Sequence, residues 1–538
     1  MMGIQGVSLA LLPVLSALIL DFIYRLYRRR QRFKDLPKPP HSFLWGHLKL
    51  MGEIASQLPP NNHPQAYITA ISQKYDLKGI WYLDLWPIAD PQVILTEPEL
   101  MDAVQVTRVY NQHRLSQEFM SSIIGENIVA TVNGPMWKKL HNAMAPAFLP
   151  SYVRTLTGLM ADETIIFREA LKKLSSSRQV FSLENELSKL VFDIVGRVVF
   201  NFSLNAQTQG SSYHEDLKQT IELINQQLSM NPFVKLQVAL KKRSVRKRVD
   251  ASVAAKIQER LAALRSENIV PSRKDPLSIL DLMLRETVLQ GKTQNGLKAL
   301  ELPEGELELL VTNVKGLLLG GMGTSVDTLC YVYMLLSKHP EVVQKMLEEQ
   351  DAVFGRDLET TMENLKESPI KLNELEYTTG VIKETMRLFP VGFGVKEAPA
   401  GATVSYQGRE YPVDGGLVIV PSWHTMHFDS RYFPEPSAFR PERFLGEGVP
   451  RGWFRSFSRG PRACLGQDLA MDIMRVILLL TVRDFHFEVA GLRPNPKPKS
   501  TYTDLDTIFG DIVFQELSME AKPRGGMMMT VSEKESAL

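Results

Sequence analysis

The sequence predicts a mainly α-helical protein with small β-sheets, arranged as a single large domain behind an N-terminal membrane anchor. Long segments carry apolar residues at helical spacing, whereas β-like runs are short and few. No flexible Gly/Ser-rich linker and no internal repeat divides the chain after about Ala55. Of the 538 residues, 44% are hydrophobic and 23% are charged, so the chain can bury a sizeable core.

The first predicted element is the membrane anchor. Val7–Tyr24 is apolar apart from small hydroxyl residues, one proline and Asp21, and a cluster of basic residues follows at once. A cleaved signal peptide is the alternative, but its basic residues would precede the apolar run. Because basic flanks stay on the cytosolic side, we expect the remaining chain in the cytosol. The segment is short against the roughly 20 residues that span a bilayer, so an anchor lying in the bilayer stays open.

Helical periodicity dominates beyond the stiff, proline-rich spacer Leu36–Pro40. The predicted helices, in order, are Tyr152–Lys173, Leu183–Val199, Asp250–Arg265, Gly305–Lys338, Glu341–Val353 and Leu465–Val482. The predicted strands are fewer and lie near Gly79, near Val93, within Val404–Val420 and after Arg524. We therefore expect the strands to form small sheets beside a helical core.

The bulk charge and the cysteine content exclude several function classes. The formal net charge is +2, which gives no overall preference for nucleic acid. The two cysteines, Cys330 and Cys464, are too few for a disulfide scaffold or for the common four-ligand structural zinc sites. We expect both to stay reduced on a cytosolic face.

Cys464 lies in the stretch Phe457–Gly466, called the ligand loop below, directly before a predicted amphipathic helix. Helix N-terminal N–H groups and the positive end of the helix dipole favour a thiolate. Phe457 would shield the sulfur from water. A lone thiolate with no His or Cys near it in sequence suits an axial ligand to haem iron better than a zinc ligand. The alternative is an inert, buried cysteine before a helix.

The remaining residues of the ligand loop fit the same interpretation. Gly460 and Gly466 lack a Cβ, which permits tight turns and the close approach of a flat ligand. Arg459 and Arg462 would add positive charge beside the sulfur.

The loop as a whole resembles the haem-ligand signature of the cytochrome P-450 family, at Phe457, Gly460, Arg462, Cys464 and Gly466. The resemblance covers about Leu36 to Val531 and implies the cytochrome P-450 fold. It also implies haem b (iron protoporphyrin IX) as cofactor, with Cys464 as the iron ligand. The chain would then divide into an anchor with its basic flank (1–35), a haem-thiolate catalytic domain (36–531) and a polar C-terminal tail (532–538).

Two further motifs match a structural network of the family. Glu384 and Arg387 in "KETMR" stand three residues apart on one helical face, and Arg443 follows in "FRPERF". The resemblance implies that these three form a buried Glu–Arg–Arg network that holds the ligand loop on the core. Either motif alone would more often be a surface ion pair.

The long helix around Thr324 resembles the family's central helix, which crosses the haem face opposite the thiolate. On this alignment Thr324, with Ser325 beside it, takes the catalytic position, where a hydroxyl supports dioxygen and its proton delivery. Gly320, Gly321 and Gly323 would open a groove in the helix. The alternative is a close-packed glycine helix in which Thr324 bonds its own backbone.

Position 323 departs from the family pattern, because Gly323 stands where the family has Asp or Glu. Glycine cannot relay a proton. Asp327, one turn further on, is a candidate substitute through water. This departure leaves both the proton route and the reaction type open.

The predicted haem-propionate contacts also depart from the family. Trp137 is present, but the fourth residue after it is His141 where the family has Arg. His141 could donate to a propionate, less strongly than a permanent cation. Arg462 is the second candidate propionate partner and Lys396 the third. For His141 by itself, an ordinary surface or core histidine is the alternative.

The chain carries no flavin or nicotinamide motif, so electrons would come from NADPH through a separate reductase, with cytochrome b5 as a further candidate donor. A basic docking face is predicted from Lys138, Lys139, Arg455 and Arg459, with ordinary solvated charges as the alternative. The basic run Leu240–Arg248 suggests contact with membrane lipid; a nuclear-import or nucleic-acid patch is the weaker interpretation.

The resulting hypothesis is a haem-thiolate monooxygenase of the endoplasmic reticulum membrane. It would insert one oxygen atom from O2 into a small apolar substrate, in fungal secondary metabolism. The predicted pocket walls are Pro390–Val395 and Leu319–Thr324. A haem-thiolate isomerase or lyase acting without a reductase is the first alternative, and a non-enzymatic haem-binding or sensor protein is the second.

Overall fold

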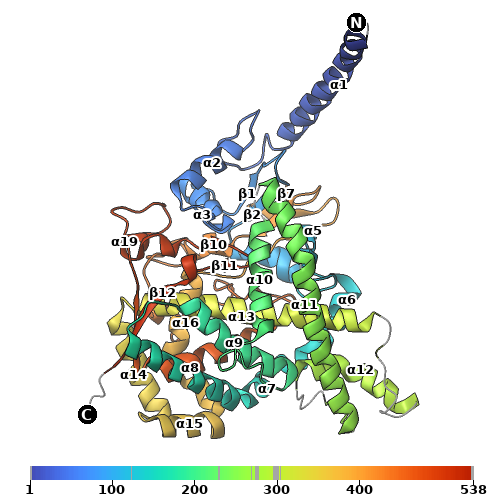
Figure 1. The fold of residues 1–538 in the computed structure, drawn as a ribbon. Helices are drawn as coiled ribbons and strands as arrows, with labels where there is room; N and C mark the ends of the chain where they lie inside the picture. The colour runs from blue at the N-terminus through green and yellow to red at the C-terminus, as the bar shows by residue number, and fades with distance from the viewer. Residues whose placement is uncertain are drawn as a thin grey trace.

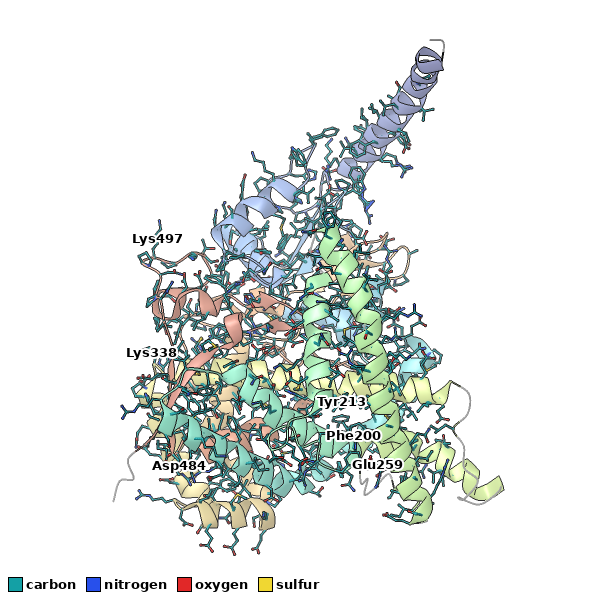
Figure 2. The ribbon with its side chains drawn as sticks, in the orientation of Figure 1. Phe200, Tyr213, Glu259, Lys338, Asp484 and Lys497 are labelled. Carbon is teal, nitrogen blue, oxygen red and sulfur yellow. The ribbon has the colours of Figure 1, made fainter. Side chains whose placement is uncertain are left out.

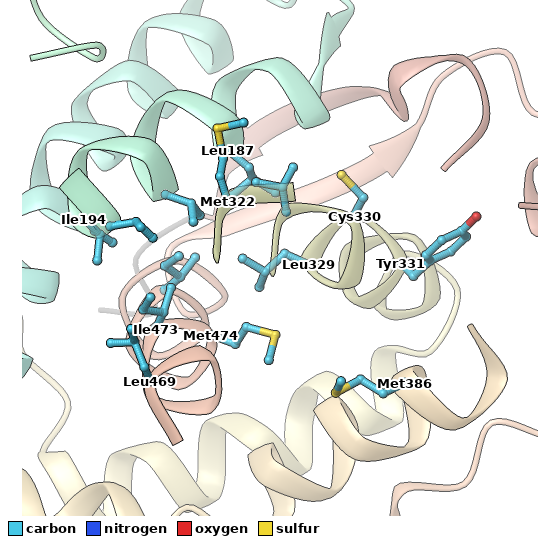
Figure 3. Close-up of a cluster of buried hydrophobic side chains, with 14 of the residues drawn as sticks. Leu187, Ile194, Met322, Leu329, Cys330, Tyr331, Met386, Leu469, Ile473 and Met474 are labelled. Carbon is cyan, nitrogen blue, oxygen red and sulfur yellow. The ribbon is translucent and has the colours of Figure 1, made fainter. Parts of the chain in front are cut away.

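Five helices meet at the centre of the molecule, in a computed structural model that describes residues 3–122, 124–227, 231–267, 269–272, 278–294, 302 and 305–534. They are α8 (Thr157–Ser177), α9 (Leu183–Phe200), α13 (Glu306–Leu336), α16 (Glu376–Leu388) and α18 (Gln467–Thr481). Buried side chains from α9, α13, α16 and α18 pack together there (Figure 3). Because α13 is apolar on nearly all sides, it runs through the interior (Figure 1).

The other helices surround this centre. They are α2 (Leu48–Gln57), α3 (Pro64–Lys74), α4 (Pro98–Asp102), α5 (Arg114–Ser121), α6 (Gly134–Met144), α7 (Pro150–Thr155), α10 (Ser212–Gln227), α11 (Pro232–Ser266), α12 (Ile279–Gln294), α14 (Pro340–Phe354), α15 (Leu358–Glu367), α17 (Trp423–His427) and α19 (Asp506–Phe509). The predicted helix Tyr152–Lys173 is interrupted at Leu156 and becomes α7 and α8. Helix α11 begins well before the predicted Asp250. The missed part buries only Val238, Val245 and Val249, so it carries too few core positions for a helical pattern to be recognised in the sequence.

The strands form a five-stranded mixed sheet and smaller sheets. The mixed sheet has the order β1-β2-β8-β5-β3, with β2 parallel to β8 and the other pairs antiparallel. Its strands are β1 (Ile80–Leu83), β2 (Gln92–Leu95), β8 (Val418–Pro421), β5 (Lys396–Glu397) and β3 (Asn111–Gln112). A second sheet joins β4 (Phe181–Ser182), β12 (Met528–Glu533) and β9 (Phe485–Val489); the hairpins are β6 (Thr403–Tyr406) with β7 (Arg409–Pro412), and β10 (Glu516–Leu517) with β11 (Ala521–Lys522). All four predicted strand regions are confirmed, whereas two-residue strands such as β10 carry no periodicity to detect.

Helix α1 (Gly3–Arg32) projects away from the body (Figure 1). The side chains of residues 1–12, which include about a third of the predicted anchor, lie outside the described side chains. Further along α1 the described apolar side chains are exposed, among them Val14, Leu15, Leu18, Ile19, Leu20, Phe22, Ile23 and Tyr24. The end of α1 and the residue after it are different, because Leu26, Arg30 and Phe33 are buried. Arg30 forms an ion pair with Asp84. The body of the protein therefore already begins within the predicted basic flank.

Among the described residues, the one helix long and apolar enough to cross a membrane is α13, and 67% of its most apolar window is buried inside the protein. Helix α13 is therefore a core helix. Elsewhere the usual partition holds: Phe200 and Tyr213 are buried between helices, whereas Glu259, Lys338 and Lys497 are exposed (Figure 2).

Candidate haem-thiolate site

The ligand loop folds back on itself immediately before α18. The Cys464 N–H donates to the carbonyl oxygen of Phe457 at 3.0 Å, and the Ser458 N–H donates to that of Arg455 at 2.7 Å. Helix α18 begins after Gly466, so Cys464 lies at the helix N-terminus as predicted. These backbone bonds hold the sulfur at one place, independently of any side chain.

The two loop glycines serve different purposes. Gly460 has a φ of +80°, and a Cβ on it would lie 2.4 Å from the carbonyl oxygen of Gln105. The loop therefore needs glycine at 460 both for its left-handed backbone and for this close approach. Gly466 has a φ of −83°, and a Cβ there would lie 3.9 Å from the Cys464 sulfur. The backbone conformation at 466 therefore does not require glycine. Gly466 lines the cavity.

The charge around the sulfur differs from the prediction. Arg459 donates to Asp102 at 2.8 Å, so its charge is neutralised away from Cys464. Burial raises the pKa of the Cys464 thiol, while a hydrogen bond from the Gly466 N–H lowers the same pKa. The side chain is nonetheless accessible from the cavity, since Cys464 is exposed there. Coordination of a metal would supply the charge that holds a thiolate in such a setting.

A cavity of about 430 Å³ opens above Cys464 and reaches α13. Its wall includes Val391–Gly394 and the α13 residues Gly320, Gly321, Thr324 and Ser325, as the predicted pocket walls require. The Thr324 hydroxyl donates to the carbonyl oxygen of Gly320 at 2.8 Å, which is the backbone bond of the alternative interpretation. Thr324 therefore faces the cavity and bonds its own helix at the same time. The predicted wall is too wide, because it includes five residues that do not line the cavity: Pro390, Val395, Leu319, Met322 and Gly323. Leu319 faces α10 and α11 instead.

The predicted propionate residues also meet at this cavity. Trp137 and His141 lie one turn apart on α6, with ring centroids 4.9 Å apart. The Arg462 guanidinium lies 4.6 Å from the centre of the Trp137 ring and donates to Asn133 at 3.0 Å. Lys396, on β5, is 4% exposed.

The cations at this edge of the cavity fit an anionic ligand. Burial lowers the pKa of Lys396 to about 8, with repulsion from Arg462 adding to the effect, and burial lowers the pKa of Arg462 to about 10. Within the described part of the chain no carboxylate raises either pKa. A buried lysine beside a half-buried arginine, neither with an acidic partner among the described residues, is costly unless an anion joins them. Together with the thiol, they fit an iron porphyrin that carries propionates.

The predicted Glu–Arg–Arg network is present and buried. Glu384 accepts two hydrogen bonds from Arg387, both at 2.8 Å, and a third from Arg443 at 3.2 Å. Arg387 also donates to the carbonyl oxygens of His427 and Pro436, both at 2.8 Å. Because these carbonyls belong to the segment that leads to the ligand loop, the network ties that segment to α16.

Comparison with known proteins adds the decisive observation. A sequence model of the cytochrome P-450 family matches residues 37–506. The chain belongs to the cytochrome P-450 family. It is 30% identical over 515 residues to the cytochrome P-450 monooxygenase acrF of Aspergillus aculeatus, covering 90% of this chain and 100% of that protein. It is 27% identical over 488 residues to polC of Polytolypa hystricis, covering 88% and 86% of the two chains.

These relatives establish the reaction class. The protein is a haem-thiolate monooxygenase, and membership of the P-450 family implies haem and a redox partner that supplies electrons. The isomerase or lyase alternative is not favoured, because acrF, polC and further relatives are named monooxygenases or cytochromes P-450.

One part of the predicted docking face of this P-450 is wrong. Arg455 is 0% exposed and donates to Pro98 and Asp102, so it cannot contact a partner. It is buried because it joins the ligand-loop segment to α4. Lys138 and Lys139 on α6 are exposed, as the prediction requires.

Sequence reasoning missed one buried side chain beside the P-450 site. Glu520, in the turn between β10 and β11, places its carboxylate against Gly323 of α13. Gly323 and Glu520 are far apart in sequence but meet in the fold. The sequence gives no sign of this contact, because a single acidic residue in a short turn forms no recognisable pattern. Asp327, the predicted substitute, is also buried and lies in the same group.

Proposed function

We propose that this P-450 oxidises a small apolar substrate in fungal secondary metabolism. The observation that carries the proposal is a cavity of about 430 Å³ that both Cys464 and Thr324 line. Its wall is mostly apolar, with Val195, Val198, Val199 and Phe393 among the lining residues, which favours a hydrophobic substrate. The relatives from Aspergillus, Polytolypa and Penicillium support a fungal setting.

The proposed cofactor is haem b, whose bound iron supplies the activation of dioxygen. Cys464 would ligate the iron as a thiolate. Arg462, Lys396 and His141 would hold the propionates, and Trp137 packs against Arg462. On the opposite wall, the Thr324 hydroxyl can hold a proton and exchange its hydrogen bond to Gly320 for one directed into the cavity.

Electrons are proposed to come from NADPH through a separate reductase, with cytochrome b5 as a second donor. The exposed Lys138 and Lys139 support an acidic partner that docks near α6, beside the propionate residues. Exchange of both lysines for Glu should slow reduction by the reductase and leave reduction by dithionite unchanged.

The substrate class can be tested by binding and by turnover. Purified full-length protein is screened with apolar compounds for shifts of the haem absorption band, and compounds that shift it are then incubated with NADPH and reductase. We expect a product that carries one atom of isotopically labelled dioxygen. Cys464→Ser should lose the carbon-monoxide spectrum of the reduced thiolate-ligated haem. Products formed without NADPH or label would contradict the proposal.

We also propose a location at the endoplasmic reticulum membrane, with the exposed part of α1 as the single anchor and a catalytic domain that begins within the predicted basic flank and extends to about residue 531. The exposed apolar side chains of α1 support this, as do Phe233, Leu236 and Leu240 at the exposed start of α11. Removal of residues 2–24 should release the protein from membranes and keep its haem, because Arg30 and Phe33 remain. Removal of residues 2–35 should also destabilise the body, measured by urea unfolding. If the protein without residues 2–35 is soluble and as stable as the protein without residues 2–24, the body begins at Leu36.

A further inference from the structure

A group of ionisable side chains is buried behind α13 at Gly323. This acid group consists of Asp327 on α13, Glu520 in the β10–β11 turn, Glu184 on α9 and Lys522 on β11. Asp327 is 3% exposed and Glu520 is 5% exposed. Within the described residues, Oδ2 of Asp327 and Oε2 of Glu520 are both buried without a hydrogen-bond partner. Buried carboxyl oxygens without a partner are costly, so they call for an explanation.

Glu520 occupies the space that a side chain at position 323 would need. A Cβ on Gly323 would lie 2.6 Å from Oε1 and 3.2 Å from Cδ of Glu520. The absent side chain of Gly323 is thus replaced by a carboxyl group from another element. Position 323 directly precedes Thr324, whose hydroxyl lines the cavity.

The surroundings of Glu520 suit a proton donor. Burial raises the pKa of Glu520 to about 7; Glu184 raises this pKa and Lys522 lowers it. Burial, with Glu520 and Glu184, raises the pKa of Asp327 well above its ordinary value, which favours its neutral form. The groups that face Glu520 are therefore Asp327 from α13, Glu184 from α9 and Lys522 from β11. An acid with a pKa near the working pH both gives and regains a proton readily.

The acid group also has a connection to solvent. Lys522 donates to Glu184 at 3.1 Å, and the two side chains are 21% and 26% exposed. Protons can therefore enter at this ion pair and reach Glu520 inside. On the other side of α13, Gly320 and Thr324 line the cavity, and a Cβ at Gly320 would meet nothing within 4 Å.

We propose that Glu520 supplies protons toward Thr324 during monooxygenation, from the position left open by Gly323. The reaction RH + O2 + 2 e⁻ + 2 H⁺ → ROH + H2O consumes two protons. Glu520 gives up one proton at a time, becomes a carboxylate, and regains a proton from solvent through the Glu184–Lys522 pair. The two electrons come from the redox partner. The proposed role of Glu520 therefore depends on the proposed function only in the source of these electrons.

The first test needs no substrate. Infrared spectra of the full-length holoenzyme are recorded while the pH is raised from about 6 to about 8. We expect the C=O band of one protonated carboxyl to disappear with a midpoint near pH 7, as burial of Glu520 requires. Glu520→Gln keeps the size of the side chain and should remove this band. A spectrum without a titrating band, or with the same band in the variant, overturns the proposal.

The second test measures proton-dependent turnover. NADPH oxidation with added reductase should fall roughly 100-fold in Glu520→Gln, at the lower end of the range for loss of a general acid, and its solvent deuterium isotope effect should rise. Glu516→Gln is the matched control, because Glu516 lies in the same hairpin and binds Arg524 instead of facing α13. The haem content of both variants should equal that of the parent. Equal rates in parent and Glu520→Gln overturn the proposal.

The third test moves the acid to α13. Glu520→Ala should be slow, and adding Gly323→Asp to it should restore part of the rate, because alanine frees the space that a Cβ at 323 needs. Gly323→Asp alone should not be faster than the parent. A double variant with normal haem content and no recovery overturns the proposal. If the parent accepts no electrons from the reductase, the proposed electron source is wrong, while the infrared band still decides the role of Glu520.

Discussion

Gly460 lies four residues before Cys464, the proposed iron ligand, and packs against the backbone of the turn that follows α4. Its φ of +80° and the distance of 2.4 Å between its would-be Cβ and the Gln105 carbonyl oxygen leave no room for a side chain. Because Gln105 is itself part of a helical turn, its oxygen cannot move away without disturbing that turn. The position of Cys464 therefore depends on a residue that has no side chain to contribute.

Gly460→Ala is expected to remove most of the haem. The left-handed backbone alone costs about 1–2 kcal/mol for a residue with a Cβ, and the clash with Gln105 adds to this cost. Gly446→Ala is the matched control, since Gly446 has a φ of +61° and no atom within 4 Å of the added Cβ. Haem absorbance per protein and urea unfolding measure both effects. Equal haem content in the two variants would contradict the importance of the close approach.

Helix α16 holds the ligand-loop segment through its buried charges. Arg387 and Glu384 are both 0% exposed, and Arg387 donates to Glu384 and to the backbone carbonyl oxygens of His427, Pro436 and Ala438. Buried ion pairs contribute little net stability, but removal of one partner leaves an uncompensated charge. The network therefore acts on the arrangement of the elements more than on their individual stability.

Glu384→Gln should lower the free energy of unfolding by about 3–5 kcal/mol, because Arg387 and Arg443 would keep their buried charges without a carboxylate. Glu376→Gln, at the exposed first turn of the same helix, should change it by less than about 0.5 kcal/mol. Urea unfolding of the holoenzyme measures both variants. Similar urea midpoints for Glu384→Gln and Glu376→Gln would mean that the loss of the Glu384 charge does not destabilise the protein.

Buried neutral histidines make the whole molecule sensitive to acid. Burial lowers the pKa of His63 and of His424 to about 3, that of His47 to about 4, and that of His427 well below its ordinary value. The unfolded chain binds these protons below pH 6.5, but the folded chain does not. Stability is therefore complete above about pH 6.5 and falls as the pH is lowered toward the folded pKa values.

Lowering the pH from about 6.5 to about 5 should cost about 2 kcal/mol for each such histidine, measured by urea unfolding. His424→Gln should show a smaller loss between the two pH values than the parent. His486→Gln is the control, because His486 is an exposed residue on β9, and its loss should match that of the parent. An unchanged loss in His424→Gln would show that other groups dominate acid unfolding.

Over the whole molecule, sequence patterns predicted those structural features that depend only on residues close together in the chain. The apolar periodicity of α13 and α18, the spacing within the ligand loop and the Glu384–Arg387 pair can each be recognised in a single stretch of chain. They follow from helix geometry and from backbone freedom at glycine, and these do not depend on distant contacts.

The tertiary structure alone decided the contacts between distant segments. It buried Arg455 against α4, paired Arg459 with Asp102, and brought Glu520 against Gly323. The residues that pack around an ionisable side chain decide whether it is exposed, whether its charge is paired and how far its pKa shifts. In this fold, those neighbouring residues come from positions hundreds of residues away in sequence. The sequence by itself determined the family and placed Cys464 in a recognisable motif, whereas the electrostatic character of the site arises only when the chain is folded.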